Sequence, residues 1–209
     1  MQKIKENNLL EYIRELQSII QSGIAYSKDH YTQERFERLN QITAQMLIEN
    51  YPLDEKIIKS FFGNNSGYAT PKVAVRGAVF KDNKILLVKE STDGLWALPG
   101  GWADINLTPA ENIKKEILEE TGYIAKATKL IGLFDNRLHE HKSKFQHVYI
   151  AFFLCEIIGG VPQLSYETTD IGFFTEDDLP ELSTGRVTLE EVKICFEHYN
   201  ESNLLPSFD

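Results

Sequence analysis

The chain has 209 residues, 42% of them hydrophobic, and a formal net charge of −9. The negative charge argues against nonspecific binding to DNA or to an anionic membrane. No apolar run approaches the ~20 residues of a membrane span, and the first residues lack the apolar segment of a secretory signal. The two cysteines, Cys155 and Cys195, stand far apart in the sequence. We therefore expect a cytoplasmic protein with two reduced thiols.

Residues 1–66 are expected to form a small helical N-terminal domain. Apolar residues recur at helical spacing from about 7 to 22 and from about 30 to 50, and a short third helix is predicted from 54 to about 62. Gly23 and the polar residues 27–29 predict the turn between the first two helices. Three such helices make too little core to be stable alone, so their apolar faces should pack on another surface. We expect a homodimer through this region; the alternative is that it covers the protein's own second domain.

The second domain is placed at residues 67–209, after a Gly- and Asn-rich linker. Two β-rich runs, 72–80 and 84–89, predict a hairpin. Arg76 lies between apolar neighbours in the first run, and it could be either a surface charge or a ligand of substrate phosphate. Further along, Gly100 and Gly101 let the backbone bend sharply or approach a phosphate. Two tryptophans flank this bend, Trp96 and Trp102, and each could stack on a base, although packing is the commoner role of such residues.

A helix is predicted at residues 109–121, and the sequence specifies both of its ends. Thr108 and Glu111 have the spacing of a capping box, and Pro109 suits the first helical position. Gly122 suits the left-handed residue that ends a helix.

This helix carries two unlike faces. Ile113 and Ile117 form an apolar stripe, whereas Glu116, Glu119 and Glu120 share another face. Like charges at this spacing cost roughly 0.2–0.5 kcal/mol per pair, and the helix dipole disfavours anions near the C-terminus. One interpretation is a solvated acidic face; the other is a site where a cation offsets the repulsion. Oxygen ligands without nearby His or Cys favour Mg²⁺ or Mn²⁺ over zinc.

The segment resembles the Nudix box, a glycine followed at fixed spacing by Arg-Glu-aliphatic-x-Glu-Glu-x-Gly. Two positions differ from that pattern: Leu107 stands where the family has Glu, and Lys115 where it has Arg. Lysine keeps the positive charge but loses the planar fork that holds a carboxylate bidentately. The resemblance implies an α/β/α sandwich with a mixed sheet between this helix and a C-terminal helix. The matching positions are Gly101, Glu116, Ile117, Glu119, Glu120, Gly122 and Tyr123.

The remaining elements follow from their patterns. Residues 125–134 and 145–158 are strand-like, and the second run is apolar enough for a central strand. The connection between them holds Arg137, which could bind phosphate, and His139 and His141, which we interpret as a polar loop edge. A final helix is predicted at about 188–199.

The resemblance also implies the chemistry and the residues that perform it. Family membership would make the protein a divalent-metal-dependent hydrolase of a nucleoside diphosphate linked to a group X. Lys115 would neutralise the glutamate cluster. The metal ligands would be Glu116, Glu119 and Glu120; the catalytic residues Glu119, Glu120 and Glu167, a loop glutamate; and the substrate-binding residues Arg76, Arg137, Gly100 and Gly101.

Three further segments, at 75–77, 98–104 and 182–184, resemble a bacterial subgroup described as ADP-ribose or CDP-choline pyrophosphatases. We expect hydrolysis of CDP-choline to CMP and phosphocholine, with ADP-ribose, giving AMP and ribose 5-phosphate, as the alternative. The pattern is also compatible with an RNA-processing enzyme or with a non-catalytic ligand-sensing protein. The acidic balance counts against the RNA substrate, and the intact glutamates count against the sensor.

Overall fold

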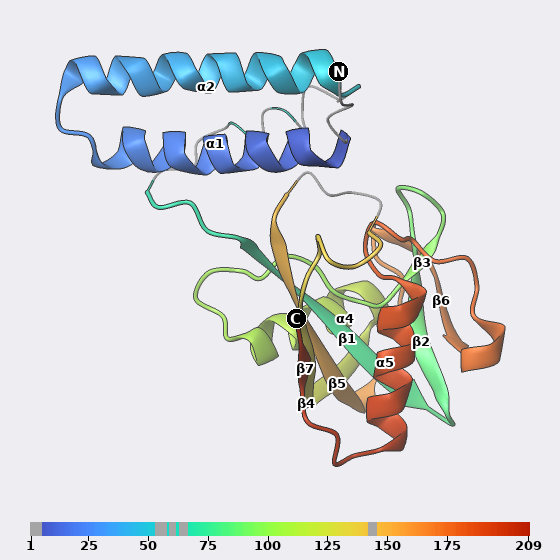
Figure 1. Cartoon of the computed structure of the whole chain (residues 1–209). Helices are drawn as coiled ribbons and strands as arrows, with labels where there is room; N and C mark the ends of the chain where they lie inside the picture. Colours follow the sequence, from blue (N-terminus) through green and yellow to red (C-terminus); the bar gives the residue numbers. More distant parts are fainter. Residues whose placement is uncertain (1–5, 53–57, 59–61, 63–66, 142–145) are drawn as a thin grey trace. The chain divides into compact units, whose positions relative to one another are not determined.

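The computed structural model describes residues 6–52, 58, 62, 67–141 and 146–209. The chain divides into two compact units, residues 1–71 and 72–209 (Figure 1). None of the helices in the described part of the chain is both long and apolar enough to cross a membrane.

The first unit contains a pair of long helices, α1 (Glu6–Tyr26) and α2 (His30–Asn50). The predicted end of the first helix at Gly23 was wrong, because α1 continues to Tyr26. Gly23 instead lies where α1 packs against α2, and an added Cβ would collide with the ring of Phe36. The turn does fall at residues 27–29, where Asp29 caps α2 by accepting from the backbone N–H of Thr32 at 2.8 Å. The predicted third helix lies almost entirely outside the described residues.

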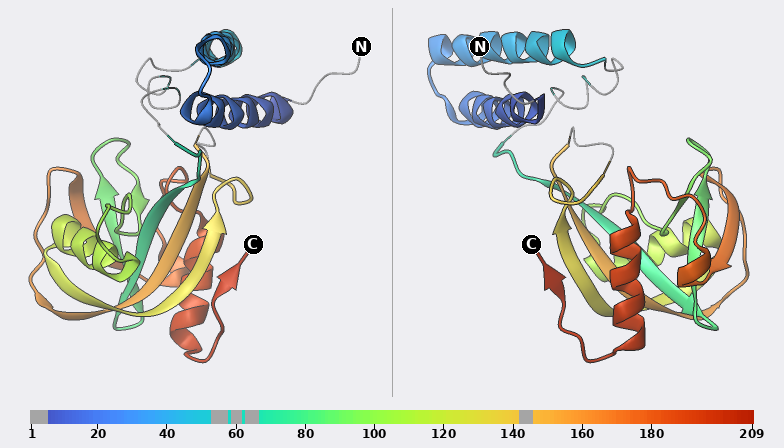
Figure 2. Two further views of the ribbon diagram at one scale, coloured as in Figure 1. Left: turned by 90° about the vertical axis from the view of Figure 1, so that its left-hand side faces the viewer. Right: turned by 45° about the vertical axis from the view of Figure 1, so that its right-hand side comes forward.

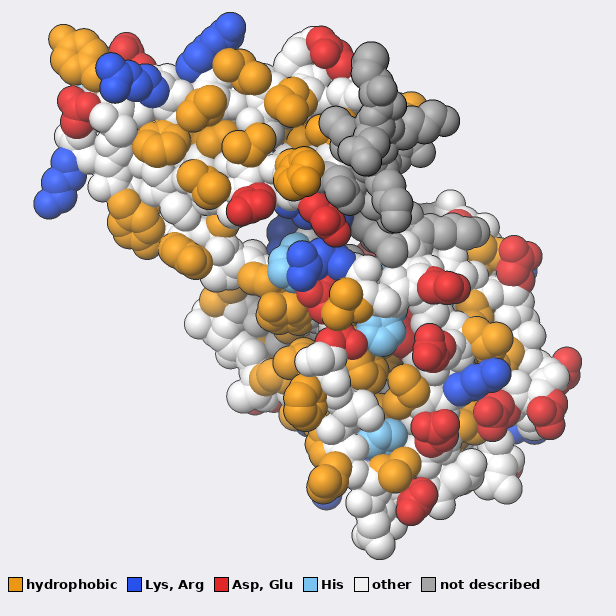
Figure 3. Space-filling model, in the orientation of Figure 1, with side chains coloured by type: hydrophobic (Ala, Val, Ile, Leu, Met, Phe, Trp, Pro, Cys, Tyr) orange, Lys and Arg blue, Asp and Glu red, His pale blue; other side chains and the backbone are white. Residues whose placement is uncertain are grey.

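The α1–α2 helical hairpin leaves much apolar surface exposed. Hydrophobic side chains are spread over the face of the α1–α2 pair that Figure 3 shows. Six large apolar side chains are 37% to 54% exposed, so the contacts between the two helices leave much of their apolar surface uncovered. They are Tyr12, Leu16, Ile19, Leu39, Ile42 and Ile48.

The second unit is built on a mixed sheet in the order β3-β2-β1-β5-β4-β7, with β6 pairing to β2. The β1–β5 and β4–β7 pairs are parallel and the others antiparallel. The predicted hairpin is confirmed as β1–β2, and the predicted central strand is β5, which lies between β1 and β4. The strands are β1 (Lys72–Lys81), β2 (Lys84–Glu90), β3 (Trp96–Ala97), β4 (Tyr123–Asp135), β5 (Val148–Gly160), β6 (Thr168–Phe174) and β7 (Ser207–Phe208).

Helices cover both faces of this sheet (Figure 2). On one face α4 (Pro109–Thr121) packs Ile113 and Ile117 against a core cluster that includes Val75 and Leu86. On the other face α5 (Leu189–Asn200) contributes Val192, Cys195 and Phe196 to a second cluster with strand residues. A short 3₁₀ turn (Glu176–Asp178) lies between β6 and α5. The predicted α/β/α sandwich is therefore confirmed, and both cysteines are buried and unpaired.

A split between β1 and β2 positions the candidate site. The two strands pair only at the hairpin end, where Ile85 and Lys84 face β1. Farther along β2, β3 pairs with Val88 and Lys89, and β6 pairs with β2 from Ile85 to Glu90. The segment at residues 99–103 lies beside the N-terminal half of β1, with backbone hydrogen bonds from Val75 N–H to Gly101 O at 2.9 Å and from Gly77 N–H to Pro99 O at 2.8 Å. The glycine bend is thus anchored to the central part of the sheet.

Candidate active site

The glycine bend lies directly against α4. Gly100 has φ +145°, and a Cβ there would collide with the carbonyl oxygen of Val75, so only glycine fits. At Gly101 a Cβ would lie 2.9 Å from Oε2 of Glu116, closer than an ordinary contact. The two glycines therefore let the backbone approach the glutamates of the helix without side chains between them.

The ends of α4 match the sequence-based prediction. Thr108 and Glu111 make the reciprocal hydrogen bonds of a capping box, with Pro109 in the first turn, and Gly122 is left-handed with φ +74°. Because both ends are fixed, the rotational position of each glutamate on the helix is fixed as well.

Glu120 is the most deeply buried of the three motif glutamates, with 6% of its surface exposed. Its Oε2 accepts a hydrogen bond from the backbone N–H of Gly100 at 2.8 Å, and its backbone carbonyl accepts one from Thr168 Oγ at 3.1 Å. Burial raises the pKa of Glu120 to about 8, although nearby Arg76 and the Gly100 N–H both favour the charged form. Arg76 and the Gly100 N–H therefore do not fully offset the cost of burying this negative charge.

Glu116 lies beside it, with its side chain 14% exposed. Burial raises the pKa of Glu116, and Lys115 opposes that rise. Glu119 differs, because its side chain is 56% exposed and pairs with Lys115 Nζ at 2.9 Å. Lys115 also contacts Asp104 at 3.2 Å, and the hydrogen bonds to Glu119 and Asp104 raise the pKa of this lysine. The predicted neutralising position of Lys115 is thus confirmed.

The three motif glutamates differ in burial, and Lys115 links two of them, with Nζ 3.9 Å from Glu116 and 2.9 Å from Glu119. Glu116 and Glu120 meet at the glycine bend, whereas Glu119 turns toward Lys115 at the rim. Within the described ranges, no three His, Cys, Asp or Glu side chains converge as a ready-made metal site. Mg²⁺ commonly keeps several waters and takes only one or two protein carboxylates, with substrate phosphates completing its shell. Glu116 and Glu120 are two carboxylates at the same bend, and burial disfavours the charge of both. They are therefore the residues that could hold such an ion.

Arg76 is 8% exposed, so its interpretation as a surface charge was wrong. Its Nη1 donates to the carbonyl oxygens of Leu98, at 3.2 Å, and Gly100, which ties the glycine bend to β1. Burial lowers the pKa of Arg76, and the charges of Glu120 and Glu90 oppose that shift. Its Nε has no hydrogen-bond partner in the part of the chain that the structure describes.

Two more carboxylates lie near this centre. Glu167 is exposed, and it directly precedes Thr168, the residue that contacts Glu120. Glu90, at the end of β2, is only 6% exposed and pairs with Arg186 Nε at 3.1 Å. Our sequence reasoning missed Glu90, because neither its spacing nor its neighbours in the sequence mark it. The pairing of β2 with β6 places it opposite Thr168, which donates a hydrogen bond to the backbone carbonyl of Glu120 in α4.

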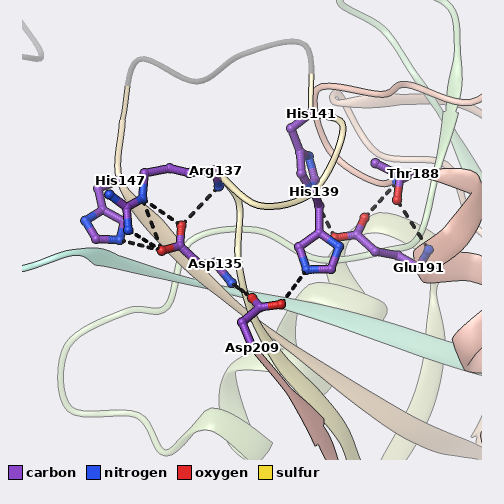
Figure 4. Close-up of polar contacts among 8 residues, drawn as sticks. All are labelled: Asp135, Arg137, His139, His141, His147, Thr188, Glu191 and Asp209. Carbon is purple, nitrogen blue, oxygen red and sulfur yellow. Dashed lines mark hydrogen bonds and ion pairs between the residues drawn. The ribbon is translucent and has the colours of Figure 1, made fainter. Parts of the chain in front are cut away.

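The polar residues of the β4–β5 connection form a separate network (Figure 4). Arg137 pairs with Asp135, with 2.6 Å between Nη2 and Oδ2, and His147 approaches the same carboxylate at 3.1 Å. Burial alone would raise the pKa of Asp135, but the hydrogen bonds from Arg137 outweigh it and lower the pKa to about 2. The charge of Arg137 is thus compensated within the protein, and its binding of substrate phosphate stays a prediction.

The two histidines of this connection differ in burial and in the carboxylate that each contacts. His141 is 3% exposed and pairs with the buried Glu191 of α5 at 2.9 Å, so its interpretation as a polar edge was wrong. His139 contacts Asp209 at 3.1 Å (Figure 4).

The two tryptophans beside the glycine bend have different surroundings. Trp96 packs edge-on against Phe174 with ring centroids 4.8 Å apart, which is a packing role. Trp102 remains 52% exposed, with Lys72 Nζ 5.4 Å from its ring centre.

Comparison with known proteins gives two family matches. The NUDIX domain family matches residues 70–193, and a family described as the UDP-X-like N-terminal oligomerisation domain matches residues 7–62. The chain belongs to the NUDIX family. Nudix hydrolases generally use divalent metal ions, in agreement with the donor set at the glycine bend.

Two relatives align along nearly the whole chain, and a third aligns with about two thirds of it. A Bacillus subtilis (strain 168) protein named "Putative ADP-ribose pyrophosphatase YjhB" is 40% identical over 200 residues, 96% of each chain. A crystal structure of a UDP-X diphosphatase covers 98% of this chain and 99% of its own, at 32% identity and a TM-score of 0.63. An ADP-ribose pyrophosphatase from Streptococcus suis 89-1591 covers 67% of this chain and all of its own, at 38% identity and a TM-score of 0.61.

These matches show the class of reaction. The protein is a Nudix pyrophosphatase, a hydrolase that acts on a nucleoside diphosphate linked to another group.

Proposed function

We propose that this Nudix pyrophosphatase hydrolyses ADP-ribose to AMP and ribose 5-phosphate. The observation that supports the reaction is the pair of buried carboxylates, Glu116 and Glu120, against the Gly100–Gly101 bend. The choice of substrate is supported by the names of the relatives from Bacillus subtilis and Streptococcus suis. We therefore propose ADP-ribose as the substrate in place of CDP-choline, which the sequence motifs favoured.

CDP-choline remains the second candidate. None of these relatives carries its name, but the full-length structural relative is a UDP-X diphosphatase. That name indicates that a chain of this architecture accepts a nucleoside diphosphate other than ADP-ribose. The base and the group X therefore have to be tested together.

In the proposed mechanism, Glu116 and Glu120 would hold Mg²⁺ or Mn²⁺, and the bound ion would neutralise charge on the diphosphate and activate water. Glu119, at the rim, is either a further ligand or the residue that orients water, and Glu167 is the second candidate for the base. Arg76 holds the carbonyl groups of the bend in place.

The Gly100–Gly101 backbone lets the substrate phosphate come close to the two carboxylates. Arg76 has a buried Nε that could face a phosphate oxygen, because that atom has no protein partner among the described residues. Arg137 is the more distant candidate, since Asp135 already compensates its charge.

A panel of substrates tests the proposal. Purified protein is incubated with Mg²⁺ or Mn²⁺ and with ADP-ribose, CDP-choline, a UDP-sugar or a capped RNA, and a second phosphatase releases inorganic phosphate from the products. We expect ADP-ribose to give the highest kcat/KM. Higher turnover of CDP-choline would replace ADP-ribose as the substrate, and a folded protein that hydrolyses no diphosphate compound would overturn the proposal.

Glu120→Gln tests the site within the same assay. Glutamine keeps the shape of the side chain but removes its charge, so we expect a loss of at least about 100-fold in kcat with the fold intact. Glu156→Gln is the matched control, because Glu156 is an exposed residue of β5. Wild-type turnover of Glu120→Gln at saturating Mg²⁺ would remove Glu120 from the site.

We also propose that the protein is a cytoplasmic homodimer joined through the α1–α2 hairpin. Two findings support the dimer: the match to an N-terminal oligomerisation domain, and the exposed apolar side chains of both helices. Light scattering after gel filtration should give twice the chain mass. The double variant Ile19→Asp and Ile42→Asp, at positions 54% and 43% exposed, should give the mass of one chain.

A further inference from the structure

Trp102 directly follows the glycine bend, and about half of its surface is left open to solvent. Its exposed fraction is 52%, whereas Trp96, before the bend, packs edge-on against Phe174. A single exposed apolar side chain is normal on a protein surface and indicates no function by itself. The place of Trp102 on the sheet gives its exposure a meaning, because it relates the ring to the candidate active site.

Strand geometry places Trp102 and the motif glutamates on opposite sides of the bend. Trp102 forms an antiparallel bridge with Ala74 of β1, and residues directly opposite in such a pair point to the same face. Ala74 belongs to the core cluster on the α5 side of the sheet. Gly101 faces the α4 side, because a Cβ there would meet the carboxylate of Glu116. Consecutive Cα atoms are only about 3.8 Å apart, so a nucleotide can span from one side to the other across these side-chain-free glycines.

The backbone and a lysine hold the indole ring in place. The residues before and after Trp102 each make a backbone hydrogen bond to β1, at 2.9 and 3.0 Å. Lys72 lies two residues before Ala74 and therefore on the same face of β1. Its Nζ is 5.4 Å from the centre of the indole ring, within the range of a cation–π contact. An ammonium group over the ring occupies one of its two faces, which leaves the opposite face for a planar ligand.

This face of β1 also carries two positive charges. Lys72 and Arg76 stand two residues to either side of Ala74, so all three side chains share the face to which Trp102 belongs. The Nε of Arg76 is buried and has no hydrogen-bond partner within the described ranges, so it can still donate to a ligand oxygen. An exposed aromatic ring between two cations suits a ligand that combines a planar ring with negative charge, and a nucleotide is such a ligand.

We propose that Trp102 is the residue on which the base of the nucleoside diphosphate stacks, with Lys72 on the opposite face of the indole. The base then lies on the α5 side of the bend, while the diphosphate lies on the α4 side at Glu116 and Glu120. Every base has a π face, so Trp102 contributes affinity rather than a choice among bases. The inference rests on the proposed nucleotide substrate, but it does not require that substrate to be ADP-ribose.

Binding of the two halves of ADP-ribose tests the proposal. AMP contains the base and ribose 5-phosphate lacks it, and neither has a diphosphate linkage to hydrolyse. We expect AMP, CMP and UMP to quench the tryptophan fluorescence of the wild type, with EDTA and again with Mg²⁺, and ribose 5-phosphate not to quench it. Trp102→Phe should lose the quenching, because Trp96 is then the only tryptophan of the chain. In calorimetry, Trp102→Ala should weaken AMP binding by about tenfold or more, and Trp102→Phe should retain most of the affinity.

The hydrolysis assay gives a second measurement. Trp102→Ala should raise KM by a factor similar to the loss in AMP affinity and leave kcat within about threefold, because stacking on a base is equally strong in the ground state and in the transition state. Phe208→Ala is the matched control, since Phe208 is an aromatic residue 81% exposed on β7, at the edge of the sheet beyond β5 and β4. That variant should change neither AMP binding nor KM.

The outcomes separate this inference from the proposed function. Quenching by AMP that Trp102→Phe abolishes, in a protein that hydrolyses no diphosphate compound, would keep the base site and overturn the proposed reaction. Hydrolysis of ADP-ribose with wild-type KM in folded Trp102→Ala would overturn the base site alone. Equal quenching by AMP and ribose 5-phosphate would do the same, as would a change of mass in light scattering together with wild-type AMP affinity. Should Trp102→Ala fail to fold, Trp102→Phe decides, and quenching that persists in that variant overturns the proposal.

Discussion

Substitution of Gly101 by alanine tests whether close approach of the backbone to Glu116 is needed for catalysis. An added Cβ would lie 2.9 Å from Oε2 and 3.1 Å from Cδ of Glu116, whereas ordinary contacts are 3.4–4 Å. The carboxylate must therefore move by roughly 0.5–1 Å. A displacement of about 1 Å in a catalytic constellation can cost about 100-fold in rate.

The cost to stability should be small. The crowded atoms are the far end of a flexible side chain, which can rotate away, and Gly101 does not have a positive φ. Replacing glycine by alanine also restricts the unfolded chain, which stabilises by about 0.4–1 kcal/mol. We therefore expect the free energy of unfolding of Gly101→Ala to change by less than about 1 kcal/mol, while kcat/KM falls by about 10- to 100-fold.

The assay is phosphate release as a function of Mg²⁺ concentration, with urea denaturation on the same samples. Gly159→Ala is the matched control, because its nearest neighbour would be 3.8 Å from the added Cβ, an ordinary contact. Wild-type kcat/KM and wild-type Mg²⁺ dependence in Gly101→Ala would refute the argument. Loss of activity together with unfolding would show that the bend is needed for stability rather than for the position of Glu116.

Three other results are expected. Thr108→Ala should lower the free energy of unfolding by about 1 kcal/mol, since it removes the hydrogen bond from Glu111 N–H at 3.2 Å, and Thr108→Ser should retain most of it in urea denaturation. Asp135, whose pKa is lowered from 3.8 to about 2, contributes stability that is fully present above pH 4 and is lost as the pH falls through 2; this corresponds to about 2 kcal/mol. The stability difference between wild type and Asp135→Asn should therefore shrink between about pH 5 and pH 2, and a constant difference would contradict the low pKa. Removal of metal by EDTA should stop turnover, and added Mg²⁺ or Mn²⁺ should restore it.

Local sequence signals were sufficient for the motif helix. Capping by Thr108 and Glu111 depends on residues three apart, and Gly122 ends the helix through its own backbone conformation. The spacing of the glutamates on a helix of known ends then follows from geometry alone. The hairpin at β1–β2 was predictable for the same reason, because alternation and a short turn are local properties.

Contacts between distant segments were not predictable in this way. The sequence placed Arg76 on a strand but could not show that Leu98 and Gly100 carbonyls would surround its guanidinium. Gly23 resembled a helix end, although the approach of Phe36 makes it an interior packing position. His141 resembled a loop residue until α5 placed Glu191 beside it.

The sequence by itself determined that a short acidic helix with defined ends follows a glycine bend, and from that the family and the class of reaction. Only the tertiary structure decided that Glu116 and Glu120 lie at the bend while Glu119 is exposed beside Lys115, and that Glu90 is buried against Arg186. The physical reason is that helix caps and periodicity act over three or four residues. The surroundings of a buried charge instead depend on strand pairing, register shifts and packing between segments that lie tens of residues apart.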